Sequence, residues 1–434
     1  MISARLRELV LLLPVGLLVT AGFAAVLLTR TEEVNELSLT YGGFFLGLCV
    51  FAHFFIRVRL PNADPFLFPL AALLAAFGLV MIYRIDEELA RQQAQWFVIG
   101  LALFCVTVVA LRDHRALERY RYTIAAVSIL LLFLPRVPGI GSQVNGAFLA
   151  IKLGPIQFQP AELAKLGIIV FLASYLSETR DVLVRGRVPR LSLKHFGPLL
   201  VVWGAAMLLL VFIRDLGSSL MFFGGFLALL YVATSRLSLV AAGAAMFAAG
   251  AVFFARTVGH VQDRVSIWLD PFRPKVVEDE GYQIAQSLFA QADGGLFGTG
   301  FGQALLDLPG GGTILPAADT DLIYALIVNE LGLFGATAVV LVCLLFAARG
   351  FKVALLARDG FSKLLAAGLT AVFAMQVFVI IGGVTRVIPL TGVTLPFVSY
   401  GGSSIVANMV LLALLLIVSQ AARRVREGAR GGVA

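Results

Sequence analysis

Hydrophobic residues gather in long runs that recur along the chain from Leu9 to Ser419. A run of about 20 apolar residues is long enough to cross a hydrocarbon layer of roughly 30 Å as a helix. The pattern predicts an all-α polytopic membrane protein with about twelve transmembrane helices, several of them short for such a layer. The predicted spans are 9–28, 39–56, 66–83, 95–111, 122–135, 161–177, 197–213, 217–235, 239–256, 325–347, 364–385 and 403–420.

The composition agrees with this fold class. Hydrophobic residues make up 59% of the 434 residues and charged residues only 14%, whereas a soluble domain has about 45–50% apolar and about 25% charged residues. A soluble enzyme is therefore excluded. Cys49, Cys105 and Cys343 all lie inside apolar runs, which indicates packing residues and neither a disulfide framework nor a cysteine-based metal site.

The net charge of +8 has a membrane explanation. Most of the 34 Lys and Arg residues lie in short segments on one side of the predicted spans, so the positive-inside rule places both termini in the cytoplasm and no nucleic-acid partner is needed. The first span has a basic flank but is long for a signal peptide, and a retained helix is predicted. Residues 421–434 form a basic cytoplasmic tail.

The charge count makes one long segment extracellular, and it differs from the other connections in size and in the sign of its charge. Residues 257–324 carry nine acidic and three basic residues and are rich in glycine. A long loop on a scaffold of short connections is more often functional than not.

The start of the predicted sixth span carries ionisable residues. Gln159 and Pro160 precede Glu162 and Lys165, which are three residues apart and share a helix face. Charged groups at membrane depth are costly and often line a cavity. Two interpretations remain open here, a structural ion pair and a pair lining a substrate cavity.

Polar groups also interrupt the apolar pattern at three later places. Arg214 and Asp215 form either an interfacial turn or a broken-helix pocket. Asp321 stands where the acidic segment becomes apolar, as a helix cap or as a base whose pKa is raised by burial. Residues 385–404, rich in Pro, Gly and hydroxyl groups, predict irregular backbone entering a cavity, where Arg386 either contacts a phosphate or anchors the interface.

Several short motifs follow one another in a recognisable order. They are Asn145-Gly146-Ala147, Gln159-Pro160-Ala161-Glu162-Leu163-Ala164-Lys165, Asp215-Leu216-Gly217, Gly281-Tyr282-Gln283, Thr320-Asp321 and Leu395-Pro396-Phe397-Val398-Ser399-Tyr400-Gly401-Gly402. Together they resemble the SEDS family (shape, elongation, division and sporulation), which includes FtsW, RodA and SpoVE. The resemblance covers roughly residues 66–420, so residues 1–65 are expected to add two helices to a ten-helix core, an actinobacterial-type arrangement.

The resemblance implies a peptidoglycan glycosyltransferase that polymerises lipid II at the outer face of the bacterial plasma membrane. It implies Asp321 as the catalytic base and a class B penicillin-binding protein as partner. The expected substrate-binding residues are Gln159, Glu162, Lys165, Arg214, Asp215, Gln283, Arg386 and Ser399. No cofactor is firmly expected, although a divalent cation is possible, and the stretch Gly382-Gly383-Val384-Thr385-Arg386 favours a RodA-like role.

Two other classes of function fit parts of the same pattern. A transporter that flips lipid-linked precursors would also have broken spans and buried charges. A non-enzymatic scaffold would recruit a transpeptidase and tolerate the loss of Asp321. An acidic residue at the outer surface favours the enzyme, because a flippase needs no base there.

Overall fold

The computed structural model describes residues 4–31, 36–144, 147–154, 156–185, 200, 204, 207, 215–277, 279, 281–307 and 312–431. Within these residues, ten helices are long and apolar enough to cross a membrane. They are α1 (Ala4–Thr31), α2 (Glu36–Arg59), α3 (Leu67–Ile85), α4 (Glu87–Ala110), α7 (Pro160–Arg185), α9 (Leu216–Thr234), α10 (Leu237–Thr257), α14 (Ile323–Leu356), α15 (Gly360–Val384) and α16 (Gly402–Gly431).

Each of these ten helices contains or overlaps a predicted span, so the polytopic helical fold is confirmed. The count of twelve is not. The predicted span 122–135 corresponds to α6 (Arg121–Phe133), whose 13 residues are too few to cross the layer without help from neighbouring segments. The predicted span 197–213 lies almost wholly outside the described residues.

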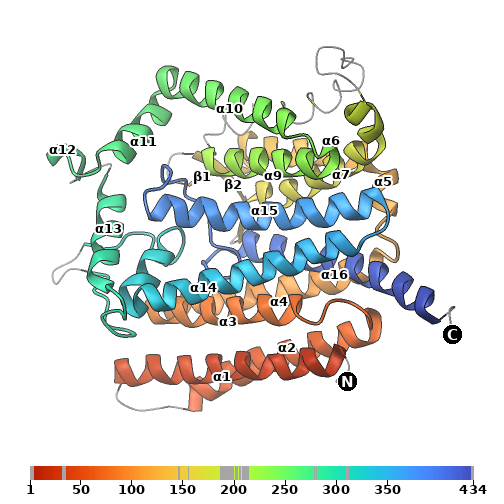
Figure 1. Ribbon diagram of the computed structural model, residues 1–434. Helices are drawn as coiled ribbons and strands as arrows, with labels where there is room; N and C mark the ends of the chain where they lie inside the picture. Colours follow the sequence, from red (N-terminus) through yellow and green to blue (C-terminus); the bar gives the residue numbers. More distant parts are fainter. Residues whose placement is uncertain are drawn as a thin grey trace.

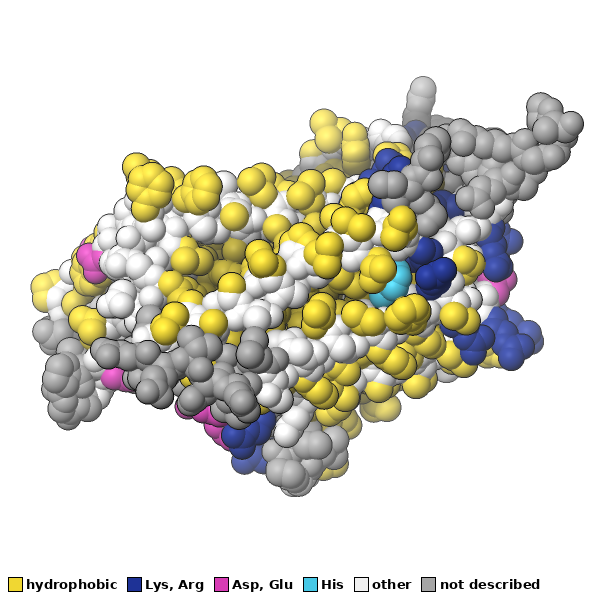
Figure 2. All heavy atoms as spheres, turned by 90° about the horizontal axis from the view of Figure 1, so that it is seen from below, with side chains coloured by type: hydrophobic (Ala, Val, Ile, Leu, Met, Phe, Trp, Pro, Cys, Tyr) yellow, Lys and Arg dark blue, Asp and Glu magenta, His cyan; other side chains and the backbone are white. Residues whose placement is uncertain are grey.

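The spanning helices run roughly parallel to one long axis (Figure 1), and both chain ends lie at the same end of the bundle. Helix α16 packs against α4, α14 against α15, and α1 against both α2 and α3. Figure 2 shows hydrophobic side chains over the middle of one face and most of the Lys and Arg side chains at its right-hand end, with a smaller group beside acidic side chains at its lower edge. This distribution is typical of a protein embedded in a bilayer.

Charged groups fasten the helices α1 and α2 to the rest of the bundle. Asp64, in the link between α2 and α3, forms ion pairs with Arg349 of α14 and Arg423 of α16. The Arg5 guanidinium of α1 donates to the carbonyls of Pro61 and Ala63 in the same link. Chain ends distant in sequence are thereby held together.

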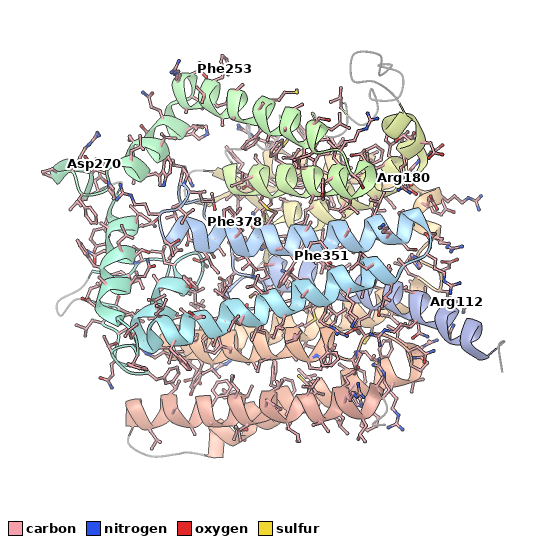
Figure 3. The ribbon with its side chains drawn as sticks, in the orientation of Figure 1. Arg112, Arg180, Phe253, Asp270, Phe351 and Phe378 are labelled. Carbon is pink, nitrogen blue, oxygen red and sulfur yellow. The ribbon has the colours of Figure 1, made fainter. Side chains whose placement is uncertain are left out.

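The end of the bundle away from the termini carries most of the remaining structure. Strands β1 (Gly141–Val144), β2 (Ala147–Leu153) and β3 (Ile156–Phe158) form a small antiparallel sheet that the hydrophobic pattern did not predict. The segment 257–324 contains α11 (Gly259–Leu269), α12 (Pro274–Val277) and α13 (Tyr282–Gly294). Figure 3 labels Asp270 at this end, opposite Arg112.

Two close backbone approaches fix α13 against α14. Gly332 interrupts α14 with φ 66°, and a Cβ there would lie 2.4 Å from the amide nitrogen of Gly298. Gly298, with φ 84°, would in turn place a Cβ 2.1 Å from the carbonyl oxygen of Glu330. Only glycine tolerates both the backbone conformation and the contact, so the 294–298 turn sets the position of the first turns of α14.

Candidate functional site

Asp321 lies on a tight turn directly before α14. Ala317 has a φ of 53°, and its carbonyl oxygen accepts from the amides of Thr320 at 3.1 Å and Leu322 at 3.0 Å. The Thr320 hydroxyl donates to Asp321 Oδ1 at 3.0 Å. The side chain does not cap α14, because Leu322 occupies the N-cap position without a side-chain hydrogen bond. The cap interpretation of Asp321 is therefore wrong.

The segment 385–401 holds this turn from the other side. Ser399 Oγ donates to the Thr320 carbonyl oxygen at 2.6 Å and accepts from the Leu395 amide at 2.8 Å. The Tyr400 amide donates to the Asp319 carbonyl oxygen at 2.8 Å. Gln93 of α4 donates from Nε2 to the Ser399 carbonyl oxygen at 3.0 Å. Ser399 thus positions the backbone beside Asp321.

Two cavities meet at Asp321. One, of about 310 Å³, is lined by Gln159, Glu162, Asp215 and Thr391 among others. The second, of about 450 Å³, is lined by His260, Asp263, Trp268 and Gln283 among others. Asp321, Arg264 and Gly392 line both cavities.

Burial changes the acidity of the carboxyl groups in the first cavity. It raises the pKa of Asp321 above its usual range, against the opposing effect of the hydrogen bond from Thr320. Burial likewise raises the pKa of Asp215, whose Oδ1 caps α9 by accepting from the Ser218 amide at 2.9 Å. The other oxygen, Asp215 Oδ2, is buried and has no hydrogen-bond partner among the described residues.

Glu162 and Lys165 form the predicted ion pair, and both are buried. Lys165 Nζ lies 2.5 Å from Glu162 Oε2 and donates to Gln376 Oε1 of α15 at 2.8 Å. Gln376 Nε2 donates in turn to the Thr394 carbonyl oxygen at 2.9 Å. The structural ion pair is therefore present, and through Gln376 it joins α7, α15 and the 385–401 segment. Glu162 lines the cavity and Lys165 does not, so a role of the pair in binding substrate stays a prediction.

The remaining predicted site residues lie in different places. Gln159 lines the first cavity, and its backbone amide donates to Ser403 Oγ at 2.7 Å. Gln283 lines the second cavity. Arg386 is not among the residues lining either cavity; its guanidinium donates to the carbonyls of Trp268 at 2.8 Å and Leu269 at 2.6 Å. Arg214 lies outside the described residues.

Arg264 is the residue that sequence reasoning missed. It stands on α11, lines both cavities, and donates from Nη1 to the Leu390 carbonyl oxygen at 2.7 Å. Its only sequence signal is that it is one of three basic residues in an acidic segment. Its position depends on how α11 folds back toward the 385–401 segment, which the hydrophobic pattern does not specify.

We find no set of protein side chains that could hold a metal ion among the described residues. Within the described part of the chain, no three His, Cys, Asp or Glu side chains come close enough together to hold one. The cavity contains carboxylates that could still meet a cation brought in with a phosphate-containing ligand, since Mg²⁺ is often held by one or two carboxylates plus substrate oxygens.

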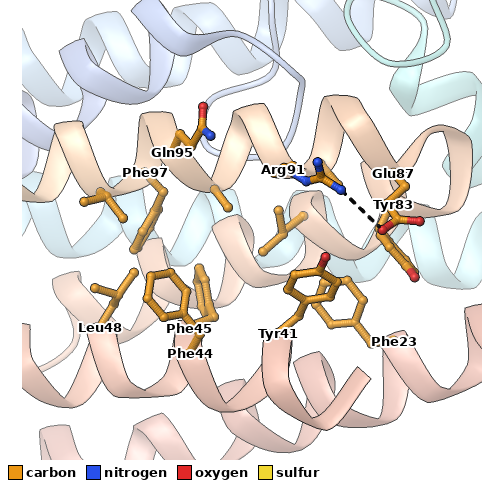
Figure 4. Close-up of a pocket in the computed structure, with 14 residues that line it drawn as sticks. Phe23, Tyr41, Phe44, Phe45, Leu48, Tyr83, Glu87, Arg91, Gln95 and Phe97 are labelled. Carbon is orange, nitrogen blue, oxygen red and sulfur yellow. Dashed lines mark ion pairs between the residues drawn. The ribbon is translucent and has the colours of Figure 1, made fainter. Parts of the chain in front are cut away.

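A third cavity lies between the first four helices and has a different character (Figure 4). It has a volume of about 210 Å³ and is walled by aromatic and aliphatic side chains such as Phe23, Phe45 and Phe97. Its charged residues, Glu87 and Arg91, face each other at 3.8 Å. Its one carboxylate, Glu87, is partly exposed and lies near Arg91, whereas the cavities at Asp321 contain buried carboxyl groups. The cavities at Asp321 are therefore the better candidates for an active site.

The fold and these cavities define a polytopic membrane protein in which two cavities share a buried carboxyl group, that of Asp321. Residues 65–424 match the FtsW/RodA/SpoVE family, described as cell cycle protein. The chain belongs to this family, as the sequence motifs predicted.

Individual relatives are similar over nearly the whole chain. The peptidoglycan glycosyltransferase RodA of Mycobacterium tuberculosis is 40% identical over 97% of this chain and 92% of its own. The stage V sporulation protein E of Bacillus subtilis is 31% identical over 83% of this chain and 98% of its own.

Solved structures share the fold. A chain from a peptidoglycan synthase complex, described in terms of coordinated polymerization and crosslinking, aligns with a TM-score of 0.68 and 27% identity over 83% of this chain and 98% of its own. The rod shape determining protein RodA of Thermus thermophilus aligns with a TM-score of 0.58 and 26% identity over 82% of this chain and 96% of its own.

Proposed function

We propose that this protein polymerises lipid II into glycan strands, with Asp321 as the catalytic base. That the protein is a peptidoglycan glycosyltransferase follows from its family and from the activity named for its relatives. The substrate and the roles of individual residues are the further steps proposed here.

One observation carries the assignment of the base: Asp321 lines both cavities at the end of the bundle away from the termini. A polymerase must hold a donor and an acceptor at once, with a proton acceptor between them. A carboxyl with a raised pKa is better matched to taking a proton near neutral pH than an ordinary aspartate.

The proposed step is a displacement at the donor sugar. Asp321 takes the proton from the 4-hydroxyl of the acceptor N-acetylglucosamine, and that oxygen attacks C1 of the donor N-acetylmuramic acid. The bond from C1 to the diphosphate oxygen breaks as the new bond forms. Undecaprenyl diphosphate leaves with its electron pair, and the configuration at C1 inverts.

The leaving diphosphate needs positive charge nearby. Arg264 is best placed to supply it, because it lines both cavities beside Asp321. The charge of Lys165 is neutralised by the ion pair with Glu162. We therefore assign Lys165 the role of positioning Glu162, which lines the cavity. The guanidinium of Arg386 already donates two hydrogen bonds to backbone carbonyls, which supports an anchoring role.

The transporter interpretation is less favoured than the enzyme. The relatives are named as glycosyltransferases, and a solved neighbour belongs to a synthase complex.

The names of the relatives also bear on the cellular role. The mycobacterial relatives named RodA are 39–40% identical over 97% of the chain, whereas the Geobacter relatives named FtsW are 31–32% identical over 81%. This difference supports a role in elongation and cell shape.

Location and partner follow from the same proposal. We place the chain in the bacterial plasma membrane, with both termini in the cytoplasm and Asp321 at the outer face. The bundle end that holds both termini (Figure 1) carries five arginines around one cavity, Arg59, Arg112, Arg115, Arg358 and Arg424, as the positive-inside rule expects of the cytoplasmic side. The proposed partner is a class B penicillin-binding protein that crosslinks the product, and the synthase complex with a similar chain supports this pairing.

The direct test is polymerisation of purified lipid II by the purified full-length protein, alone and with its transpeptidase. We expect glycan chains on a gel, shortened by a muramidase. Folded protein that makes no chains in either condition, but moves lipid II between the leaflets of vesicles, would contradict the proposal.

A further inference from the structure

A fourth cavity, of about 520 Å³, lies at the end of the bundle that holds both termini. None of the residues that line it lines the cavities at Asp321. Its arginines come from separate parts of the chain: the end of α2, the link after α4, the link between α14 and α15, and α16. Figure 3 labels one of them, Arg112, at the end where the C-terminus leaves the bundle.

We propose that this cavity binds the phosphate headgroup of an anionic phospholipid from the adjacent leaflet. The proposal is independent of the catalytic role of Asp321, since it concerns the opposite end of the molecule.

The first argument is charge. The lining contains five arginines and two aspartates, a formal excess of three positive charges with His114 neutral. Asp359 already caps α15, accepting from the Ser362 amide at 2.8 Å, and pairs with Arg115 at 3.3 Å. Asp113 Oδ1 accepts from the Arg115 amide at 3.0 Å. Asp113 Oδ1 also lies 3.7 Å from His114 Nδ1, so neither carboxylate contacts the guanidinium group of any other arginine in the cavity.

Among the residues that the structure describes, the other four arginines have no carboxylate partner. Arg59, Arg112, Arg358 and Arg424 have no acidic side chain within 4.0 Å among the described residues. The positive-inside rule accounts for basic residues on this side in general. It does not account for the convergence of four separate segments on one cavity, which is the arrangement that basic headgroup pockets use.

The second argument is the apolar wall. Val108, Val109 and Leu111 at the end of α4 and Ile417 and Val418 of α16 line the same cavity. Val109 is 42% exposed although it belongs to a spanning helix. A free phosphate gains nothing from such a wall, whereas a phospholipid places its acyl chains against it. The combination therefore favours a lipid over a soluble anion.

The test is native mass spectrometry of the full-length protein in detergent, titrated with palmitoyl-oleoyl phosphatidylglycerol or phosphatidylcholine. We expect tighter binding of the anionic lipid. The triple variant Arg59→Gln, Arg112→Gln and Arg424→Gln is expected to lose that binding by about tenfold or more, since each basic residue near an anionic lipid contributes about 1 kcal/mol.

A matched control removes the same charge elsewhere on this end of the molecule. Arg119, Lys352 and Lys363 are exposed and do not line the cavity, so their triple Gln variant is expected to change binding less than twofold. A triple Lys variant of Arg59, Arg112 and Arg424 is expected to retain most of the preference for the anionic lipid, because lysine also presents a positive charge to phosphate.

Three outcomes would overturn the proposal. Equal binding of the two lipids by the wild type would exclude an anion site. Equal losses in the two triple Gln variants would indicate diffuse surface charge. Displacement of the lipid by an equimolar amount of glycerol phosphate would show that the site takes a soluble anion.

Discussion

The burial of Asp321 predicts how the polymerisation rate depends on pH. A base works only when ionised, and burial raises the pKa of this carboxyl. Activity is therefore lost as pH falls through a value above the roughly 3.9 of an ordinary aspartate. Polymerisation rates measured from pH 4 to 8 should show this acidic limb, and Asp321→Glu should move its midpoint. A midpoint at or below the ordinary value would contradict the assignment.

Ser399 tests whether the turn before α14 must be held in place. The variant Ser399→Ala removes the donor to the Thr320 carbonyl and leaves the buried Leu395 amide unpaired, at a cost of about 1–3 kcal/mol. We expect a fall in kcat of about tenfold, with KM for lipid II changed less, and a lower midpoint of thermal unfolding. An unchanged kcat in a destabilised protein would mean that Ser399 is only structural.

At the residue scale, candidate site residues could be identified from the sequence, but most of their contacts could not. Glu162 and Lys165 are three residues apart on one helix, so their pairing follows from local geometry and was foreseen. Arg264 and Arg386 are equally conspicuous as isolated basic residues, but only the folded chain places Arg264 at both cavities and Arg386 against backbone carbonyls. That difference depends on contacts between distant segments.

At the element scale, α3 controls the 385–401 segment through Gly78. A Cβ at this position would lie 2.3 Å from the carbonyl oxygen of Val398, next to Ser399. We expect Gly78→Ala to displace the segment, lower the unfolding midpoint and reduce polymerisation more than tenfold. The control is Gly43→Ala in α2, where nothing lies within 4 Å. It should leave activity unchanged and add up to about 1 kcal/mol of helix stability; equal effects of the two variants would refute the contact.

Elements with a strong period were predictable, and those set by tertiary contact were not. The apolar runs gave the positions of ten spans because bilayer thickness imposes a minimum length on each. The strands at 141–158 are each at most seven residues long, and the helices within 257–324 lie in an acidic, glycine-rich segment, so bilayer thickness constrains neither. The end of α13 and the turn after it are held against α14 by close contacts at Gly294, Gly298 and Gly332, which no local pattern reveals.

At the scale of the whole molecule, Asp64 joins the two N-terminal helices to the rest of the bundle. Its carboxylate is buried and pairs with Arg349 and Arg423. The variant Asp64→Asn removes the negative charge that both guanidinium groups face, at a cost of roughly 3 kcal/mol. We expect a clearly lower unfolding midpoint in detergent. An unchanged midpoint would mean that helix packing alone holds α1 and α2.

The central claim is that Asp321 is the base of a lipid II polymerase, and the isosteric variant Asp321→Asn tests it most directly. The comparison is glycan formation by purified wild-type and variant proteins, each with its transpeptidase partner and each shown to be folded by its unfolding midpoint. The account predicts chains from the wild type and at least a hundredfold fewer from the variant, in line with the usual contribution of a general base. Chains of equal yield from both proteins would contradict it and move the base elsewhere, first to Glu162 or Asp215 in the same cavity.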